Sequence, residues 1–425
     1  MTNPPGLSRR RFLKRTTGAA AAGLAVPYFA TGRVSAAPGR PGANEQIAVG
    51  FIGTGGRARQ LMGFLPAGGR IVAVCDCYQQ RYREALQQKQ QDWPAYQHYR
   101  EMLEKEKLDA VVVATPDHAR VIPCLHALQA GLDIYAEKPL TLTIHEGRVL
   151  VDAVRKYKRV FQVGSQQRTM EMNAFACKLV RTGGLGKITR VQGICYPGPR
   201  DYEGLPEERV PAGDDWEVWQ SRTEARPFNN ALQFGWMGWR AYSGGEMTNW
   251  GAHGVDQVQW ARGKSLTGPT EIWPVTPGAN GKVSMRYADG VQVDYELEQG
   301  PFGGAIFHGT DAKLEIDRNR FAATPSEVVT NPPDPEVAKA WEGEGWNAGP
   351  HLQNWLDCIK TRRTPNADVE IGHRSISVCH LANFAREIGR KLRWDPDKEV
   401  FPGDDEANAY LERPRRKGWE LPELT

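Results

Sequence analysis

The chain has 425 residues, 40% of them hydrophobic and 24% charged, with a formal net charge of +4. This length accommodates two domains with a substantial core, and the nearly neutral charge, without a basic stripe, argues against nucleic acid as a partner. The seven cysteines are odd in number and irregularly spaced, so no disulfide framework is expected. None of the nine histidines forms an H-x-x-x-H pair, so no metal site is predicted.

The first 36 residues are typical of an export signal. Residues 8–14 (SRRRFLK) match the twin-arginine motif, and an alanine-rich apolar stretch follows at 18–30. That stretch is too short and too weakly hydrophobic for a membrane span, and VSA at 34–36 offers a small-residue cleavage site. We expect a signal at 1–36, a linker at 37–44, and export of the folded protein by the Tat route to the periplasm or cell exterior, with no stable membrane insertion after cleavage. An uncleaved anchor or a basic disordered arm is the alternative.

A strand, a glycine turn and a helix follow the linker. Ile47 to Ile52 form an apolar, β-rich run of the kind that a buried parallel strand needs. The turn after it fits G-x-G-x-x-(G/A), in which the second glycine lets the backbone approach a pyrophosphate and the small last residue lets the helix pack closely. The N-terminal N–H groups of that helix would point at the phosphates. We assign the whole turn to a dinucleotide cofactor: Gly53, Thr54, Gly55, Gly56, Arg57 and Ala58.

Asp76 ends the second strand of this unit, 23 residues after Gly53. A carboxylate near this spacing accepts hydrogen bonds from both ribose hydroxyls of the adenosine and repels a 2′-phosphate. The pattern therefore favours NAD over NADP, although Arg57 could neutralise a phosphate. A structural glycine turn in an unrelated α/β sheet is the alternative to a cofactor site.

Strands and helices keep alternating as far as residue 166, which predicts a Rossmann domain with a doubly wound parallel sheet at 45–166. In such sheets, ligands bind beyond the carboxyl ends of the strands. Residues that follow the later strands therefore join the candidates. For the cofactor these are Thr115, Pro116, His118, Glu137 and Lys138, and for the substrate they are Gln167 and Arg168.

Four segments together resemble the Gfo/Idh/MocA oxidoreductases. They are GFIGTGG at 50–56, ATPDHAR at 114–120, AEKPL at 136–140 and GGEMTNWGAHGVDQVQWARG at 244–263. The resemblance runs from about Gln46 to the end of the chain and is strongest to the exported branch with a bacterial-type C-terminal domain. It implies a second α/β domain at 167–425, whose open, mainly antiparallel sheet covers the substrate and mediates contact in a homo-dimer or tetramer.

The resemblance also implies which residues handle the substrate. Lys138 would share the proton of a hydroxyl while hydride leaves the same carbon for the nicotinamide, and desolvation would lower its pKa. Family members usually show G-G-x-x-x-D-x-G-x-H-x-x-D, but here Asn249 replaces the aspartate while His253 keeps the histidine. An asparagine can hydrogen-bond a hydroxyl but cannot take its proton. A helix-capping role without chemistry is the alternative for His253.

The second domain supplies further substrate candidates. Residues 197–240 are irregular and rich in Pro, Gly and Trp, and too long for a simple connector, which predicts a functional loop. Its aromatic residues either face a sugar or pack the loop and a dimer contact, and the sequence favours neither. We add Trp239, Arg240 and Asp256 to the substrate candidates. Alternating patterns at 282–317 predict an antiparallel meander, and two helices are expected after it, near 351–360 and 374–392.

These expectations combine into an exported NAD-dependent oxidoreductase with a tightly held cofactor, acting on a secondary hydroxyl of a sugar, inositol or glycoside. One alternative is an NAD-using enzyme that cleaves glycosides. It would transiently oxidise a ring carbon, eliminate or hydrolyse the glycosidic group, and reduce the carbon again. A non-catalytic sugar- or nucleotide-binding protein of the same fold is the third hypothesis, and Asn249 is its only support.

Overall fold

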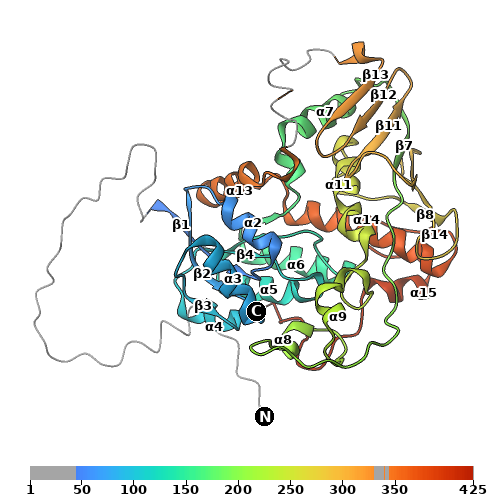
Figure 1. Ribbon diagram of the computed structural model, residues 1–425. Helices are drawn as coiled ribbons and strands as arrows, with labels where there is room; N and C mark the ends of the chain where they lie inside the picture. The colour runs from blue at the N-terminus through green and yellow to red at the C-terminus, as the bar shows by residue number, and fades with distance from the viewer. Residues whose placement is uncertain (1–44, 330–338, 340–343, 425) are drawn as a thin grey trace, which may run out of the picture.

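The computed structural model describes residues 45–329, 339 and 344–424, arranged as two α/β units that lie side by side (Figure 1). The predicted export signal and linker lie outside the described residues, as does part of the stretch between the last strands and the closing helices. Within the described part, no helix is long and apolar enough to cross a membrane.

The N-terminal unit is built on a six-stranded sheet in the order β3-β2-β1-β4-β5-β6, with every pair parallel. This confirms the predicted doubly wound sheet. Its strands are β1 (Ile47–Ile52), β2 (Gly69–Cys75), β3 (Ala95–Tyr96), β4 (Ala110–Val113), β5 (Asp133–Ala136) and β6 (Phe161–Val163). Strands β1, β4 and β5 are wholly buried, because helices cover both faces of the sheet.

Two groups of helices cover those faces. One face carries α4 (Tyr99–Lys105), α5 (Val121–Gln129) and α6 (Ile144–Tyr157). The other carries α2 (Gly56–Phe64) and α3 (Gln79–Lys89), together with α13 (Gly349–Thr361) from far along the chain. The α13 side chains Leu352, Trp355 and Leu356 are fully buried in the same cluster as Phe51 and Tyr135. A helix within the segment assigned to the second domain therefore completes the core of the first.

The C-terminal unit has a mixed sheet of eight strands in the order β13-β12-β11-β7-β10-β9-β8-β14. The strands are β7 (Ile188–Ile194), β8 (Glu271–Pro274), β9 (Val283–Arg286), β10 (Gln292–Leu297), β11 (Ala305–Gly309), β12 (Lys313–Ile316), β13 (Phe321–Thr324) and β14 (Leu392–Arg393). Only the pair β7–β10 is parallel among these described strands. The predicted simple meander is therefore wrong at one step, because β7 lies between β10 and β11.

Three helices cover one face of this sheet: α7 (Glu171–Arg181), α11 (Gly251–Ala261) and α14 (Val369–Ile388). The short α10 (Glu246–Asn249) precedes α11 directly and lies against α14. Strand β5 ends beside this helical layer, since a side chain that follows it bonds to α10. The carboxyl-terminal edge of the N-terminal sheet thus faces the helices of the C-terminal unit.

Residues 197–240, here called the arm, contain the short helices α8 (Trp216–Gln220) and α9 (Asn230–Phe234). The arm has a small aromatic core of its own, formed by Trp216, Trp219, Phe228, Leu232 and Trp239 together with the adjacent Tyr242. After α15 (Asp405–Asn408), the last described residues, 412–424, form a tail that returns to the N-terminal unit. Leu421 and Leu424 of this tail pack on the hydrophobic cluster beneath α5 and α6.

Candidate functional site

The glycine turn after β1 has the geometry of a dinucleotide cradle. Gly53 has φ +86°, and a Cβ there would lie 2.8 Å from the carbonyl oxygen of Ala114, so only glycine fits without strain. Among the described atoms, a Cβ on Gly55 or Gly56 would meet nothing within 4 Å. The N-terminus of α2 therefore opens onto free space, as binding of a pyrophosphate requires.

Asp76 is held rigidly at the end of β2. Its Oδ2 accepts hydrogen bonds from the backbone N (2.8 Å) and the hydroxyl (3.1 Å) of Thr54, and its Oδ1 accepts from the backbone N of Tyr78 (3.0 Å). Burial raises the pKa of Asp76, which these hydrogen bonds oppose. The carboxylate lines a pocket together with Gly53 and Thr115, as expected for a group that accepts the ribose hydroxyls.

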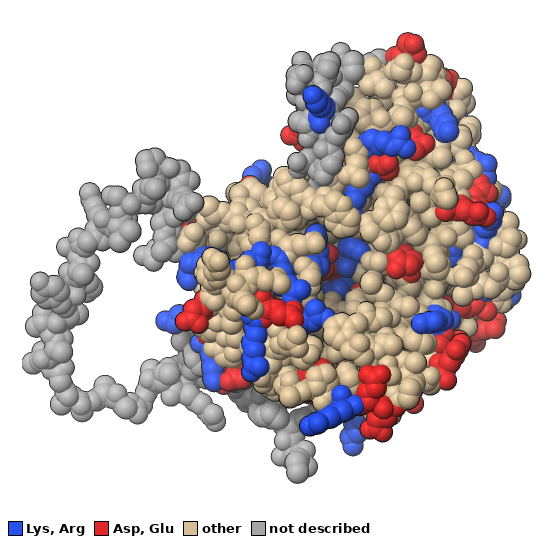
Figure 2. All heavy atoms as spheres, in the orientation of Figure 1, with Lys and Arg blue, Asp and Glu red and all other residues tan. Residues whose placement is uncertain are grey.

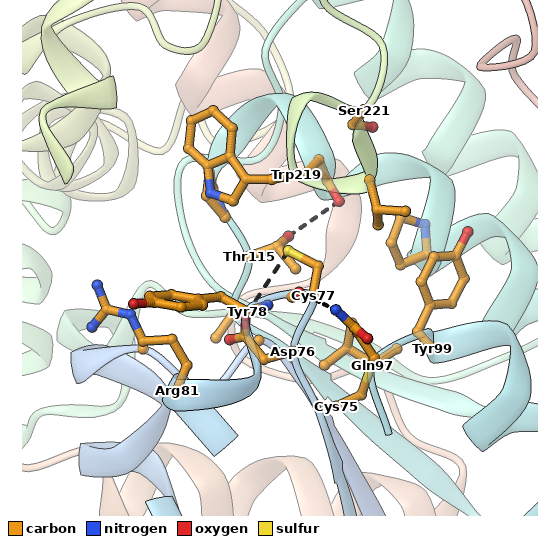
Figure 3. A pocket seen from close by; sticks show the side chains of 18 of the residues that line it. Cys75, Asp76, Cys77, Tyr78, Arg81, Gln97, Tyr99, Thr115, Trp219 and Ser221 are labelled. Atoms are coloured by element: carbon orange, nitrogen blue, oxygen red, sulfur yellow. Dashed lines mark hydrogen bonds between the residues drawn. The ribbon is translucent and has the colours of Figure 1, made fainter. Parts of the chain in front are cut away.

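The pocket beside Asp76 is covered by two distant parts of the chain. Figure 3 shows Trp219 and Ser221 of the arm across the pocket from Asp76, and Trp419 of the tail also lines it. Trp219 stacks on Trp216 at 4.6 Å between ring centres. Trp219, one of the aromatic residues for which sequence analysis left a sugar contact and loop packing equally open, therefore lies over the adenosine end of the cofactor site.

The arm and the tail are tied to each other. Arg416 Nη1 forms an ion pair with Glu217 Oε2 at 2.6 Å, and the backbone N of Arg416 donates to the carbonyl oxygen of Arg222 at 3.0 Å. Arg222 also pairs with the buried Glu146 of α6 and with Glu412. These contacts join the arm and the tail to α6 of the N-terminal unit.

The residues predicted to follow β4 divide between two positions. Thr115 and Pro116 line the cofactor pocket. His118 is buried behind it, where its Nε2 lies 2.8 Å from the carbonyl oxygen of Trp219 and its ring contacts Trp219 and Tyr242. Burial lowers the pKa of His118 to about 4, so it is neutral. Its contacts link the N-terminal unit to the arm.

Lys138 directly follows β5 and reaches across to the C-terminal unit. Its Nζ donates to Asn249 Oδ1 at 2.6 Å and to the backbone carbonyl of Asn249 at 3.1 Å. Burial lowers the pKa of Lys138 to about 8, against the opposing effects of Glu137 and Asp117. At this pKa a lysine exchanges a proton near neutral pH, as an acid–base group must.

His253, one turn into α11, lies in the same site. It is buried, and its Nε2 lies 3.4 Å from Arg318 Nη1. Burial lowers the pKa of His253 well below its ordinary value, and the nearby charges of Arg318 and Lys138 lower it further. His253 is therefore neutral at physiological pH and serves as a hydrogen-bonding group.

Glu137 and Arg57 form an ion pair beside this site, with Arg57 Nε 2.8 Å from Glu137 Oε1. Burial disfavours the charged guanidinium, but Glu137 outweighs it and raises the pKa of Arg57. A Cβ on Gly164 would lie 2.8 Å from Glu137 Oε2, so the turn after β6 closes tightly on this carboxylate. The pair holds the Arg57 guanidinium against Glu137.

The other predicted substrate residues make contacts within the protein. Arg168 Nε pairs with Asp256 Oδ2 at 2.8 Å, and both side chains are buried. Gln167 donates to the carbonyl oxygen of Gly303. Trp239 is buried in the aromatic core of the arm, and Arg240 pairs with Asp201 and Glu387. The structure does not bring these five side chains into contact with Lys138 among the described interactions, and their substrate role stays a prediction.

Sequence analysis missed a group of residues near the catalytic candidates. Phe302 and Trp346 are 45% and 52% exposed, and both contact Trp250, with ring centres 3.9 Å and 5.9 Å apart. Arg318 lies beside them, 4.5 Å from the ring centre of Trp346. Trp250 lies inside the quoted motif and could have been noticed, but the other three come from separate loops and follow no spacing rule. In the described ranges, no three His, Cys, Asp or Glu side chains are arranged to hold a metal.

Comparison with protein families agrees with this geometry. Residues 47–165 match the model of an oxidoreductase family's NAD-binding Rossmann fold, and residues 199–421 match that of the C-terminal alpha/beta domain of the same family. The chain belongs to the Gfo/Idh/MocA oxidoreductase family. Since the open glycine turn and Asp76 fit a dinucleotide, the N-terminal unit is the NAD-binding domain of this family member.

Relatives with curated names match only part of this Gfo/Idh/MocA protein. A glycosyl hydrolase family 109 protein of Shewanella pealeana is 26% identical over 203 residues, which are 43% of this chain and 44% of that protein. An inositol 2-dehydrogenase of Salmonella typhimurium is 25% identical over 39% of this chain and 48% of its own length. The matched region thus spans less than half the length of these curated relatives.

Solved structures share the fold over most of the chain. The WlbA dehydrogenase from Bordetella pertussis, in complex with NADH and UDP-GlcNAcA, has a TM-score of 0.60 at 18% identity, covering 82% of this chain and 99% of that one. Scyllo-inositol dehydrogenase from Lactobacillus casei, with bound NAD(H) and scyllo-inositol, has a TM-score of 0.58 at 15% identity, covering 82% and 99%. At these identities the likeness establishes the fold.

Proposed function

We propose that this protein is an NAD-dependent oxidoreductase that oxidises or reduces one secondary hydroxyl of a sugar, inositol or glycoside. One observation carries the proposal: Lys138, with its pKa lowered to about 8, bonds to Asn249 at 2.6 Å in the site that also holds the neutral His253. Lys138 follows β5 at the same sheet edge as the glycine turn after β1. This position supports a role for the titratable amine in exchanging a proton with a substrate hydroxyl beside the cofactor.

In such a reaction, one set of residues handles the substrate hydroxyl and another binds the cofactor. NAD, when bound, supplies the nicotinamide carbon that accepts or returns hydride. Lys138 in its neutral form takes the hydroxyl proton during oxidation, and in its charged form returns it during reduction. His253 holds the same oxygen by a hydrogen bond, while Asn249 keeps the amine in position. Gly53, Gly55 and Asp76 hold the distant phosphates and ribose.

The experiment is a screen of polyols, sugars and glycosides with the purified protein and NAD, followed by the absorbance of the reduced cofactor. Lys138→Ala is the matched variant, because the phosphate and ribose contacts lie elsewhere in the site. The proposal requires a substrate that reduces NAD with wild-type protein and loses about 100-fold or more in rate with the variant. Turnover that does not depend on Lys138 would remove this lysine from the mechanism.

Redox-neutral cleavage of a glycoside is the second candidate function. The observation that favours it is that Trp219 and Trp419 line the adenosine pocket, where they would hinder release of the cofactor. A redox-neutral reaction regenerates NAD in the site, so it does not require the cofactor to exchange. Two curated relatives named glycosyl hydrolase family 109 proteins, 26% and 32% identical over part of the chain, agree with it. Release of an aglycone without net reduction of NAD would support this function over simple dehydrogenation. A purely binding protein would show neither reaction.

We further propose that the protein is exported folded by the Tat route and assembles as a homo-oligomer. The first proposal rests on SRRRFLK at 8–14. Replacing Arg9 and Arg10 by lysine should retain the protein in the cytoplasm of its host, which fractionation would detect. The second proposal rests on the open sheet of the C-terminal unit, and light scattering of the purified protein would give the number of subunits.

A further inference from the structure

Arg318, in the turn after β12, is a buried cation whose described partners are all neutral. Only 3% of the residue is exposed. Its Nε donates to the carbonyl oxygen of Gly345, and its Nη1 faces His253 Nε2 at 3.4 Å. Its Nη2 lies beside the side-chain amide of Gln166, whose oxygen accepts from it once that amide is turned over. Among the side chains that the structure describes, no carboxylate lies within ion-pair distance of this guanidinium. A buried charge without a counter-ion is costly, which makes such an arginine informative about what binds there.

The surroundings add to the excess of positive charge. Glu137 is neutralised by Arg57, and Asp117 by Arg120. Lys138 faces the neutral amide of Asn249. Burial is the main reason that the pKa of Arg318 is lowered to about 10; the nearby charge of Arg57 adds to this effect, and the carboxylate of Glu137 opposes it. Figure 2 shows Lys and Arg atoms inside a recess between the two units.

Aromatic rings form the walls beside this cation. The Arg318 guanidinium lies 4.5 Å from the ring centre of Trp346 and 5.5 Å from that of Trp250, and Lys138 Nζ lies 6.0 Å from Trp250. Phe302 packs on Trp250 and is partly exposed. Exposed aromatic faces next to polar groups suit the apolar face of a sugar ring. Phe302 and Trp346 therefore offer exposed ring faces beside the buried guanidinium of Arg318.

We propose that the substrate is a sugar acid, such as a hexuronate or its glycoside, and that Arg318 binds its carboxylate while a nearby ring hydroxyl is oxidised. This rests on the proposed hydride transfer at Lys138. Because Arg318 Nη1 lies 3.4 Å from His253 Nε2, a carboxylate on Arg318 and a hydroxyl on His253 must be close neighbours in one molecule. A guanidinium binds a planar carboxylate well.

The test compares acids with their neutral counterparts. Glucuronate, galacturonate and mannuronate are each paired with the matching hexose, and glucose 6-phosphate is included as the other anion. Wild type, Arg318→Gln, Arg318→Lys and Arg320→Gln are assayed as full-length proteins for NAD reduction and for binding by calorimetry. Arg320 is the matched control, since it lies two residues away but is exposed and pairs with Glu315 and Asp317.

We expect at least one hexuronate to be preferred over its hexose by about 10-fold or more in kcat/KM. Arg318→Gln should reduce that preference to near unity, mainly through KM, while Arg318→Lys keeps part of it and Arg320→Gln keeps it all. If the Gln variant does not fold, as judged by its thermal transition, the Lys variant decides, because a charge without the planar fork should bind the acid more weakly.

Three outcomes would overturn the inference. They are a preference for neutral sugars, an acid preference that survives Arg318→Gln, and tighter binding of glucose 6-phosphate than of every hexuronate. Reduction of NAD by neutral polyols alone would overturn the acid substrate and leave the proposed oxidoreductase intact. Hexuronates that bind through Arg318 but are never oxidised or reduced would support the carboxylate site while removing hydride transfer.

Discussion

Lys138 Nζ lies 2.6 Å from Asn249 Oδ1, so the amine of one unit is held by an amide of the other. Asn249 Nδ2 donates to Glu246 Oε2 at 3.0 Å, and this hydrogen bond orients the amide so that its oxygen points toward Lys138. Where the family pattern places an aspartate, this chain therefore places an amide with a carboxylate one turn earlier. The amine therefore faces a neutral amide, and burial lowers the pKa of Lys138 to about 8.

The first prediction concerns Lys138 itself. Lys138→Ala should lower the turnover of the preferred substrate by about 100-fold or more, because a positioned acid–base group contributes on that scale. NAD binding should be retained, since Asp76 and the glycine turn are untouched. Steady-state kinetics and calorimetry with NAD check the two parts, and loss of NAD binding would show that the lysine acts on the cofactor instead.

The second prediction concerns pH. With the pKa of Lys138 lowered to about 8, its neutral form appears as the pH rises through 8. The rate of oxidation should therefore rise through about pH 8 and the rate of reduction should fall. Asn249→Asp adds a negative charge beside the amine, which raises the pKa of Lys138 and of His253 and moves the oxidation profile to higher pH. Rate–pH profiles of both proteins test this, and an unchanged midpoint in the variant would contradict it.

The third prediction concerns Glu246. Glu246→Ala frees the Asn249 amide to rotate, so turnover should fall by about 2- to 10-fold, the scale of one hydrogen bond of 0.5–1.5 kcal/mol. Glu246→Gln can still accept from Asn249 Nδ2 and should retain most of the activity. A structural role alone would shift the thermal transition of both variants without separating their kcat values.

The fourth prediction concerns the choice of cofactor. Asp76 should favour NAD over NADP by about 10-fold or more, which corresponds to about 1.4 kcal/mol. Sequence analysis noted that Arg57 could neutralise a 2′-phosphate, but Arg57 is paired with Glu137. We therefore expect the preference for NAD to persist. Arg81 lines the pocket near Asp76, and we expect Asp76→Ser to improve NADP binding through it. Calorimetry with both cofactors, and with Asp76→Ser/Arg81→Ala, tests this, and equal affinities in the wild type would refute it.

The fifth prediction tests whether Asp256 stabilises the fold or contacts the substrate. Asp256 pairs with the buried Arg168 and accepts from Ser375 at 2.7 Å. Asp256→Ala should lower the free energy of unfolding by about 3–5 kcal/mol, because it leaves a buried charge unpaired. Glu101→Ala, which breaks the exposed pair with Lys105, is the control and should change little. A stable Asp256→Ala protein with a raised KM would instead support the predicted contact with substrate.

Sequence reasoning reached the parts of the site that are contiguous in the chain. Gly53 and Asp76 lie in one strand–turn–helix–strand unit, and Lys138 follows a strand whose partners are local, so spacing alone located them. Arg318 and Trp346 could not be found this way, because two separate loops bring them to His253. The covering role of Trp219 was missed for the same reason, since it depends on contacts with the tail. Strand β7 broke the expected meander because β10 pairs with it in parallel, which hydrophobic alternation does not encode.

Because α13 completes the core of the N-terminal unit, that unit cannot finish folding until α13 has been synthesised. Residues 349–361 cover a face of the N-terminal sheet through Leu352, Trp355 and Leu356. During synthesis, the nascent N-terminal unit keeps that face in contact with water until the ribosome has released a segment almost 200 residues beyond β6. The two units therefore cannot mature one after the other. A truncated chain that ends at residue 166 should be insoluble, whereas the full chain can complete both cores.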